Sequence, residues 1–95
     1  MFKIGQKVLC DNVETKFRIE DGVEGIILAV NENQEKFDEE TGEFIGFDTL
    51  YTVAFVERRF GYELTEAEED QLFDLGVKFF DCTKLFMFAD DVFTA

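Results

Sequence analysis

Hydrophobic and polar positions along the chain form short blocks, and one of these blocks organises the rest. Two glycines, Gly22 and Gly25, precede the consecutive apolar residues 26–30. An apolar run of this length suits a strand buried on both faces, whereas a helix would need ten or more periodic residues. We therefore expect residues 25–30 to form the central strand of a small β-rich core.

A second apolar block, residues 50–56, follows a polar stretch with a Glu-Thr-Gly turn between two phenylalanines. This pattern predicts a long hairpin at residues 31–48 that joins two antiparallel strands. If paired residue numbers sum to about 81, three facing pairs are all aromatic or aliphatic, as stable sheets prefer. This register places Val30 opposite Tyr51, Leu28 opposite Val53 and Ile26 opposite Phe55.

The remaining strand signals are shorter. Residues 7–10 follow a turn at Gly5 and predict a first strand, and the alternation at residues 16–20 indicates a half-exposed strand or the arm of a loop. Asp21 and Gly22 supply the next turn. Near the end of the chain, residues 77–82 and 84–89 predict two closing strands, and residues 90–93 a final turn or edge segment.

One helix is expected, at residues 65–75. Thr65 and Glu68 form a capping box, and Gly76 can end the helix in the left-handed conformation. The apolar residues that could touch the core are Ala67, Leu72 and Leu75. The residues expected to form an outer acidic ridge are Glu66, Glu69, Asp70 and Asp74.

Net charge is −13, and it is distributed unevenly. Residues 1–30 carry −1, whereas residues 31–95 carry −12. Such a surface repels nucleic acid and anionic membranes and attracts basic partners. The alternative explanation is that the acids only keep the domain in solution. The adjacent Arg58 and Arg59 are expected to be internal ion-pair partners and not a nucleic-acid patch.

The chain has 13 phenylalanines and two tyrosines among its 95 residues. A single domain of this size lacks the interior volume to bury so many rings. Some of them should therefore lie on the surface, as a binding patch or as a face for self-association in a homodimer.

Catalysis is not expected. The chain has no histidine, which removes the usual general base and the commonest metal ligand. Residues 38–43 are rich in carboxylates, but Gly42 stands at the fifth position from Asp38, where an EF-hand loop needs glycine at the sixth. We therefore predict an ordinary hairpin turn there, and neither a cofactor nor a metal.

Cys10 and Cys82 lie far apart, without metal-ligand or redox spacing, and we expect both to be buried and reduced. The first residues have no apolar core of a signal peptide, and no apolar run reaches the roughly 20 residues of a membrane helix. A cytoplasmic location is therefore expected.

Three short motifs support a family resemblance: Phe-x-Ile-Gly-x-x-Val at residues 2–8, Gly-x-x-Gly-x-Ile at 22–27, and Tyr-x-Val-x-Phe at 51–55. Their order resembles the SH3-like small barrels of the KOW and Tudor kind. The resemblance implies a first strand, a long loop, a glycine-led central hairpin and a short closing strand. The fold class predicted is thus mainly β with one short α-helix, as a small bent antiparallel sheet or SH3-like barrel. Residues 1–95 would form one domain, with residues 65–75 as a helical insertion.

Two functions remain open. The first is an acidic protein-binding module that occupies a basic surface, as a nucleic-acid mimic of the kind that many phage-encoded inhibitors resemble. The second is a structural or adaptor barrel that binds a partner, or itself, through exposed phenylalanines. The residues expected to bind the partner are those of the ridge, Glu66, Glu69, Asp70 and Asp74, joined by Asp38, Glu39, Glu40 and Glu43 at the hairpin tip.

Overall fold

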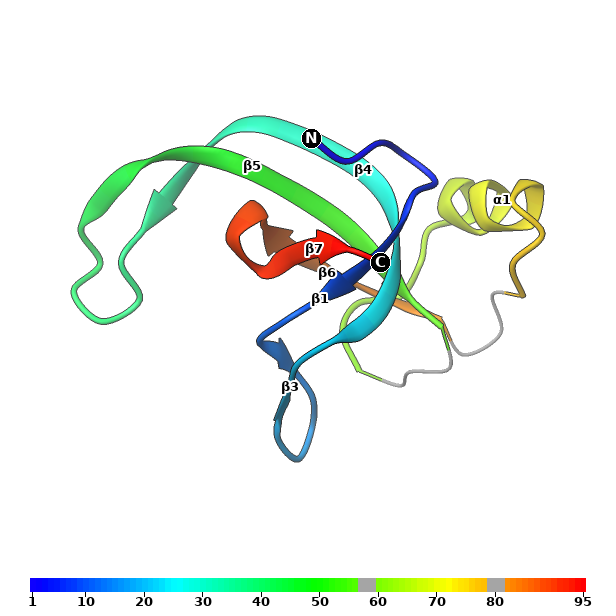
Figure 1. Ribbon diagram of the computed structural model, residues 1–95, viewed down its shortest axis with the longest axis horizontal. Coiled ribbons are helices and arrows are strands. Elements are labelled where there is room, and N and C mark those ends of the chain that lie inside the picture. Colours follow the sequence, from blue (N-terminus) through cyan, green and yellow to red (C-terminus); the bar gives the residue numbers. More distant parts are fainter. Residues whose placement is uncertain (57–59, 79–81) are drawn as a thin grey trace.

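The main element of the fold is a bent, five-stranded antiparallel sheet (Figure 1). The computed structural model describes residues 1–56, 60–78 and 82–95. The strands of the sheet, in spatial order, are β6 (Thr83–Phe88), β5 (Phe44–Phe55), β4 (Val23–Phe37), β1 (Lys7–Cys10) and β7 (Val92–Thr94). Among the described residues no pairing joins β6 to β7, so the sheet stays open.

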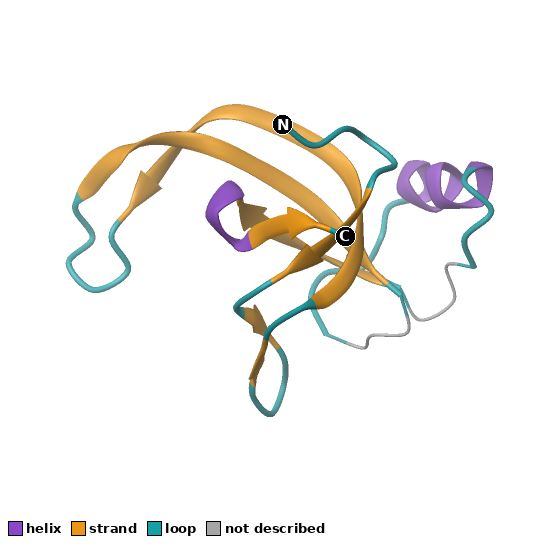
Figure 2. Cartoon of the chain, in the orientation of Figure 1, coloured by secondary structure: helices purple, strands orange, loops and turns teal. Residues whose placement is uncertain are grey.

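Three smaller elements complete the chain (Figure 2). Strands β2 (Val13–Glu14) and β3 (Ile19–Glu20) form a separate two-stranded hairpin. The helix α1 (Glu66–Asp74) lies between β5 and β6 in the sequence, and the 3₁₀ helix η1 (Ala89–Asp91) joins β6 to β7. The predicted fold class, mainly β with one short helix and a small bent antiparallel sheet, is confirmed.

The predicted pairing of the two central strands is correct at one end and wrong at the other. Val30 pairs with Tyr51 as expected, but Ile27 pairs with Val53 and Ile26 with Ala54. Leu28 therefore does not face Val53, and Ile26 does not face Phe55. The cause is a β-bulge, because the ladder slips by one residue between Ile27 and Ala29.

Residues 25–28 of strand β4 are buried on both faces, as the unbroken apolar run predicts. Ile27 belongs to the larger core cluster, together with Val53 and the fully buried Phe55. Ile26 and Leu28 belong to a second cluster on the other face. Leu72 of helix α1 is fully buried in this second cluster, so the helix covers one face of the sheet.

Helix α1 begins and ends as its sequence predicts. The Thr65 side chain accepts a hydrogen bond from the Glu68 backbone N–H, and the Glu68 side chain accepts one from the Thr65 backbone N–H. At the other end of the helix, Gly76 has a φ of 75°. The N–H groups of Gly76 and Val77 donate to the carbonyls of Phe73 and Leu72, which completes a Schellman motif. Of the three apolar residues expected to touch the core, Leu72 does.

The other two, Ala67 and Leu75, are exposed. The helix is short and contacts the sheet along a narrow line, so only one apolar position turns fully inward. Near the end of the chain the strand predicted at residues 77–82 is not formed at Val77 and Lys78, and residues 79–81 lie outside the described residues. Arg58 and Arg59 also lie outside them. The strand predicted at residues 84–89 corresponds to β6, and the edge segment predicted at residues 90–93 overlaps β7.

The predicted long hairpin is present and projects from the sheet (Figure 1). Strand β1 pairs only with the first residues of β4, Val23 to Ile26. Strand β6 pairs with β5 only from Leu50 onward. Residues 31–48 therefore form a two-stranded ribbon, which we call the hairpin arm. Two further bulges interrupt its ladder, and Asn33 adopts a φ of 58° at one of them. Bulges bend strands, which explains why the arm is curved.

Candidate protein-binding surfaces

The ridge predicted on helix α1 is present on its outer face. Glu66, Asp70 and Asp74 are four residues apart and all exposed, so they lie in a row along the helix. Glu69 is half-buried beside them. No ion pair to these four carboxylates occurs within the described residues. The helix therefore presents a row of acidic side chains to solvent.

A fifth helix acid, Glu68, has a structural role instead. Its Oε1 lies 2.6 Å from Lys84 Nζ of strand β6, and both side chains are about 15% exposed. Burial by itself raises the pKa of Glu68, but hydrogen bonds from Lys84 and Thr65 outweigh it and hold the pKa below its usual value. Glu68 thus fixes the helix to the sheet, whereas the carboxylates of the acidic ridge form no ion pair within the described residues.

The acids at the tip of the hairpin arm are of two kinds. Asp38 accepts hydrogen bonds at Oδ1 from the backbone N–H groups of Glu40 and Thr41, at 2.8 and 2.9 Å. These bonds, that from Thr41 first, hold the pKa of Asp38 below its usual value. Asp38 therefore shapes the turn, whereas the exposed Glu39, Glu40 and Glu43 have no such role.

The structure does not bring the two acidic groups together. Helix α1 and the tip of the hairpin arm lie at opposite ends of the molecule, whose longest extent is 40 Å (Figure 1). The eight predicted residues therefore make two separate surfaces and not one continuous face. The reason is topological, because the arm extends away from the sheet on the side opposite the helix.

An aromatic patch on the hairpin arm was not located by sequence reasoning. It consists of Phe37, Phe44 and Phe47, which are 51%, 52% and 63% exposed. The ring centroids of Phe37 and Phe44 are 5.8 Å apart, and those of Phe44 and Phe47 are 5.2 Å apart, both edge to face. The sequence signal was the pair of phenylalanines that flank the predicted tip.

Lys36 ties the arm to the end of the sheet. Its Nζ lies 2.7 Å from Asp90 Oδ2 and 3.5 Å from Asp48 Oδ2, and 5.1 Å from the centroid of the Phe88 ring. The hydrogen bond to Asp90 is the main reason why the pKa of Lys36 is raised. The positive charge of this lysine is therefore already paired within the molecule.

A pocket of about 460 Å³ lies beneath the tip of the arm. Its lining combines two rings, one aliphatic side chain, three carboxylates and the paired Lys36, namely Phe37, Phe88, Ile45, Asp38, Glu39 and Glu40. The pocket is open to solvent. A lining of this kind suits a cationic side chain better than an anionic one.

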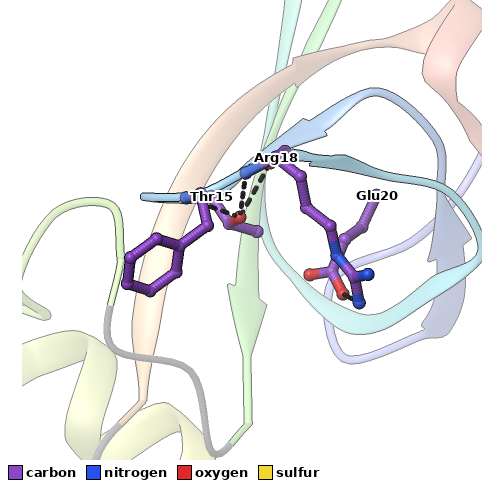
Figure 3. Close-up of polar contacts among 4 residues, drawn as sticks. Thr15, Arg18 and Glu20 are labelled. Carbon is purple, nitrogen blue, oxygen red and sulfur yellow. Dashed lines mark hydrogen bonds and ion pairs between the residues drawn. The ribbon is translucent and has the colours of Figure 1, made fainter.

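A second projecting loop lies between β2 and β3. In the turn between β2 and β3, Thr15 Oγ1 donates to the Arg18 carbonyl at 2.7 Å and accepts from the Arg18 N–H at 3.1 Å (Figure 3). Arg18 also pairs with Glu20 at 3.1 Å. The same turn leaves Phe17 89% exposed. Phe17 is therefore an exposed phenylalanine outside the hairpin arm, with which the phenylalanines of the arm can be compared.

Within the described residues, no group of three or more cysteine or carboxylate side chains is placed to hold a metal ion. The described part of the chain also contains no helix with the length and hydrophobicity that a bilayer-spanning segment requires.

Comparisons with protein-family models, with curated proteins and with solved structures gave no match.

Proposed function

We propose that the protein is a non-enzymatic acidic module that binds a basic surface on a nucleic-acid-handling protein and blocks it as a nucleic-acid mimic. The observation that carries this proposal is the exposed row of Glu66, Asp70 and Asp74 on helix α1. These carboxylates exceed what capping requires, and they have no cationic partner within the described residues. Because they lie outside the core, their charge contributes little to the fold.

The spacing of the row supports mimicry. Residues four apart in an α-helix are separated by about 6 Å along its axis. This interval is comparable to that between successive phosphates of a nucleic-acid strand. A groove whose lysines and arginines receive phosphates can therefore receive these carboxylates. Association of this kind is fast at low ionic strength and weakens as salt screens the charges.

The proposal includes a resemblance to SH3-like barrels and a cytoplasmic location. The first is supported by the order of elements, in which strand β1, a long loop, the β4–β5 hairpin and the closing strand β7 follow one another. It is also supported by the pairing of β7 with β1. The location is supported by Cys10 and Cys82, which are buried and not joined in a disulfide, as is usual in a reducing compartment. Phage-encoded inhibitors are the functional class that this combination resembles.

A second candidate function is an adaptor that binds a partner, or another copy of itself, through exposed phenylalanines. The aromatic patch on the hairpin arm favours it, because three exposed rings in mutual contact are typical of an interface and not of an inert surface. Binding of this kind depends on apolar contact and changes little with salt.

The test is a comparison of the natural protein with a variant in which Glu66→Gln, Glu69→Gln, Asp70→Asn and Asp74→Asn are combined. Both are used to capture partners from the native host, and the captured protein is then purified. Mimicry predicts that double-stranded DNA competes for the partner, and that the variant loses at least tenfold in affinity with a smaller salt dependence. A partner that binds both proteins equally and ignores DNA would overturn the proposal in favour of the adaptor.

A further inference from the structure

The hairpin arm combines the two kinds of group that recognise a cation. Its aromatic patch offers three exposed ring faces and edges in one continuous row. Residues 31–48 also contain seven acidic residues and a single basic one, Lys36. Glu35 is the cross-strand partner of Phe47, so a carboxylate lies directly beside the patch.

The one cation of the arm does not cancel this charge. Lys36 is held by Asp90 at 2.7 Å and by Asp48 at 3.5 Å, so two carboxylates already balance it. The exposed Glu39, Glu40 and Glu43 at the tip remain without an ion pair within the described residues. A ligand at the arm therefore meets aromatic rings surrounded by negative charge.

The backbone of the arm is accessible as well. On its β1 side strand β4 is bonded as far as Ile27, which exchanges backbone hydrogen bonds with Gly5 and Gln6. Among the described residues no strand pairs with β4 on that side beyond Ile27, and none pairs with β5 on its β6 side before Leu50. In this region of the described chain both outer edges of the ribbon are open. An extended peptide can add to such an edge through backbone hydrogen bonds, while its side chains reach the face of the ribbon.

We infer that the hairpin arm binds an extended, arginine-rich segment of the partner protein. A guanidinium is planar and weakly hydrated, so it stacks on a ring and donates to a carboxylate at the same time. Lysine offers only a point charge, and a neutral side chain offers neither contact. The inference rests on the proposed function and names the part of the partner that the arm contacts. A second copy of this chain is a poor occupant, because it carries a net charge of −13.

The experiment titrates three fluorescently labelled peptides of equal length into the whole protein. In the first peptide arginine alternates with glycine, in the second lysine replaces arginine, and in the third the neutral isostere citrulline replaces it. Two variants test the arm: Phe37→Ala combined with Phe44→Ala and Phe47→Ala, and Glu39→Gln combined with Glu40→Gln and Glu43→Gln. One matched control lies outside it, Phe17→Ala combined with Phe73→Ala. A third variant, Glu66→Gln combined with Asp70→Asn and Asp74→Asn, removes the same number of charges from helix α1 and shows whether the peptide binds there instead. Phe47→Leu serves where the triple phenylalanine variant fails to fold.

The inference predicts that the arginine peptide binds at least threefold more tightly than the lysine peptide and that the citrulline peptide does not bind. Each arm variant should weaken the arginine peptide about tenfold and by more than the helix variant does, and the phenylalanine control should not weaken it. Equal binding of arginine and citrulline peptides would overturn the inference. Loss of binding only in the helix variant would overturn it while leaving the proposed function intact. If neither basic peptide bound, the inference would be overturned, and the proposed function would still be decided by DNA competition for the partner.

Discussion

Gln71 of helix α1 donates a hydrogen bond from Nε2 to the backbone carbonyl of Leu28, at 2.9 Å. Leu28 is the bulged residue of strand β4, where the ladder with β5 slips by one position. A bulge leaves a backbone group without its partner in the sheet. The helix supplies the missing partner, so the position of the helix and the register of the central strands stabilise each other.

The first prediction concerns this contact. Gln71→Leu should lower the free energy of unfolding by about 1–3 kcal/mol, the usual cost of leaving a buried carbonyl unsatisfied. Gln34→Leu, at an exposed position of the hairpin arm, is the control and should change stability by less than about 0.5 kcal/mol. Urea unfolding followed by circular dichroism measures both. Equal effects of the two substitutions would show that the helix does not support the bulge.

The second prediction compares two phenylalanines. Phe55 is fully buried in the larger core cluster, whereas Phe17 is 89% exposed. Phe55→Ala should cost about 3–5 kcal/mol, because it empties a packed aromatic site. Phe17→Ala should leave the melting temperature nearly unchanged. An unchanged melting curve for Phe55→Ala would mean that the assigned inner face of strand β5 is wrong.

The third prediction is at Gly25, where strands β4 and β5 approach closely. A Cβ atom at this position would lie 2.5 Å from Val53 Cγ1 and 3.0 Å from the Ala54 carbonyl oxygen. Gly25→Ala should therefore destabilise the protein by about 1–3 kcal/mol through overpacking. Gly42→Ala is the comparison, because nothing lies within 4 Å of its Cβ and only its φ of 73° is unfavourable. A smaller loss for Gly25→Ala than for Gly42→Ala would contradict the packing described for this strand pair.

The local features of this fold could be predicted from the sequence, and the long-range ones could not. Strand β1 and the capping box at Thr65 depend on a few neighbouring residues, and both are confirmed. The bulge at Leu28 is accompanied by a hydrogen bond from Gln71, which is 43 residues away. Neighbouring residues alone predict a regular register between β4 and β5, and that prediction is wrong at the bulge.

The candidate binding surfaces also combine local features, which the sequence predicts, with long-range features, which it does not. The exposure of the helix acids follows from helical spacing, which the sequence displays directly. The aromatic patch depends on which phenylalanines share a face of the arm, and bulges change the face that each residue occupies. The separation of the two acidic groups depends on the direction in which the arm leaves the sheet. No local pattern encodes that direction.

The fourth prediction concerns the thiols. Burial, together with the nearby Asp11 and Asp91, raises the pKa of Cys10 to about 12, and Cys82 is also buried. Because the thiolate is the reactive form, both cysteines should react about a hundredfold more slowly in the folded protein than in urea. Absorbance during reaction with a disulfide reagent measures the rate, and Cys82→Ala isolates the signal of Cys10. Fast labelling of Cys10 in the native protein would contradict its burial.

The last prediction concerns pH and the pair formed by Glu68 and Lys84. The pKa of Glu68 is lower in the folded protein than its ordinary value of 4.5. A lowered carboxyl pKa contributes stability above the ordinary value, and this contribution is lost as the pH falls through the folded pKa. Glu68→Gln should therefore cost about 2 kcal/mol at neutral pH, and its difference from the natural protein should shrink as the pH falls below 4.5.

The control for this prediction is Glu24→Gln, which breaks the pair of Glu24 with Lys7. That pair is 3.0 Å long, but its side chains are 64% and 59% exposed, so its removal should change stability by less than about 1 kcal/mol at any pH. Denaturant unfolding at several pH values between neutral and about 3 follows both variants. A loss for Glu68→Gln that is constant across this range would refute the ion-pair account. The contact of Glu68 with Lys84 would then stabilise the helix through packing and not through charge.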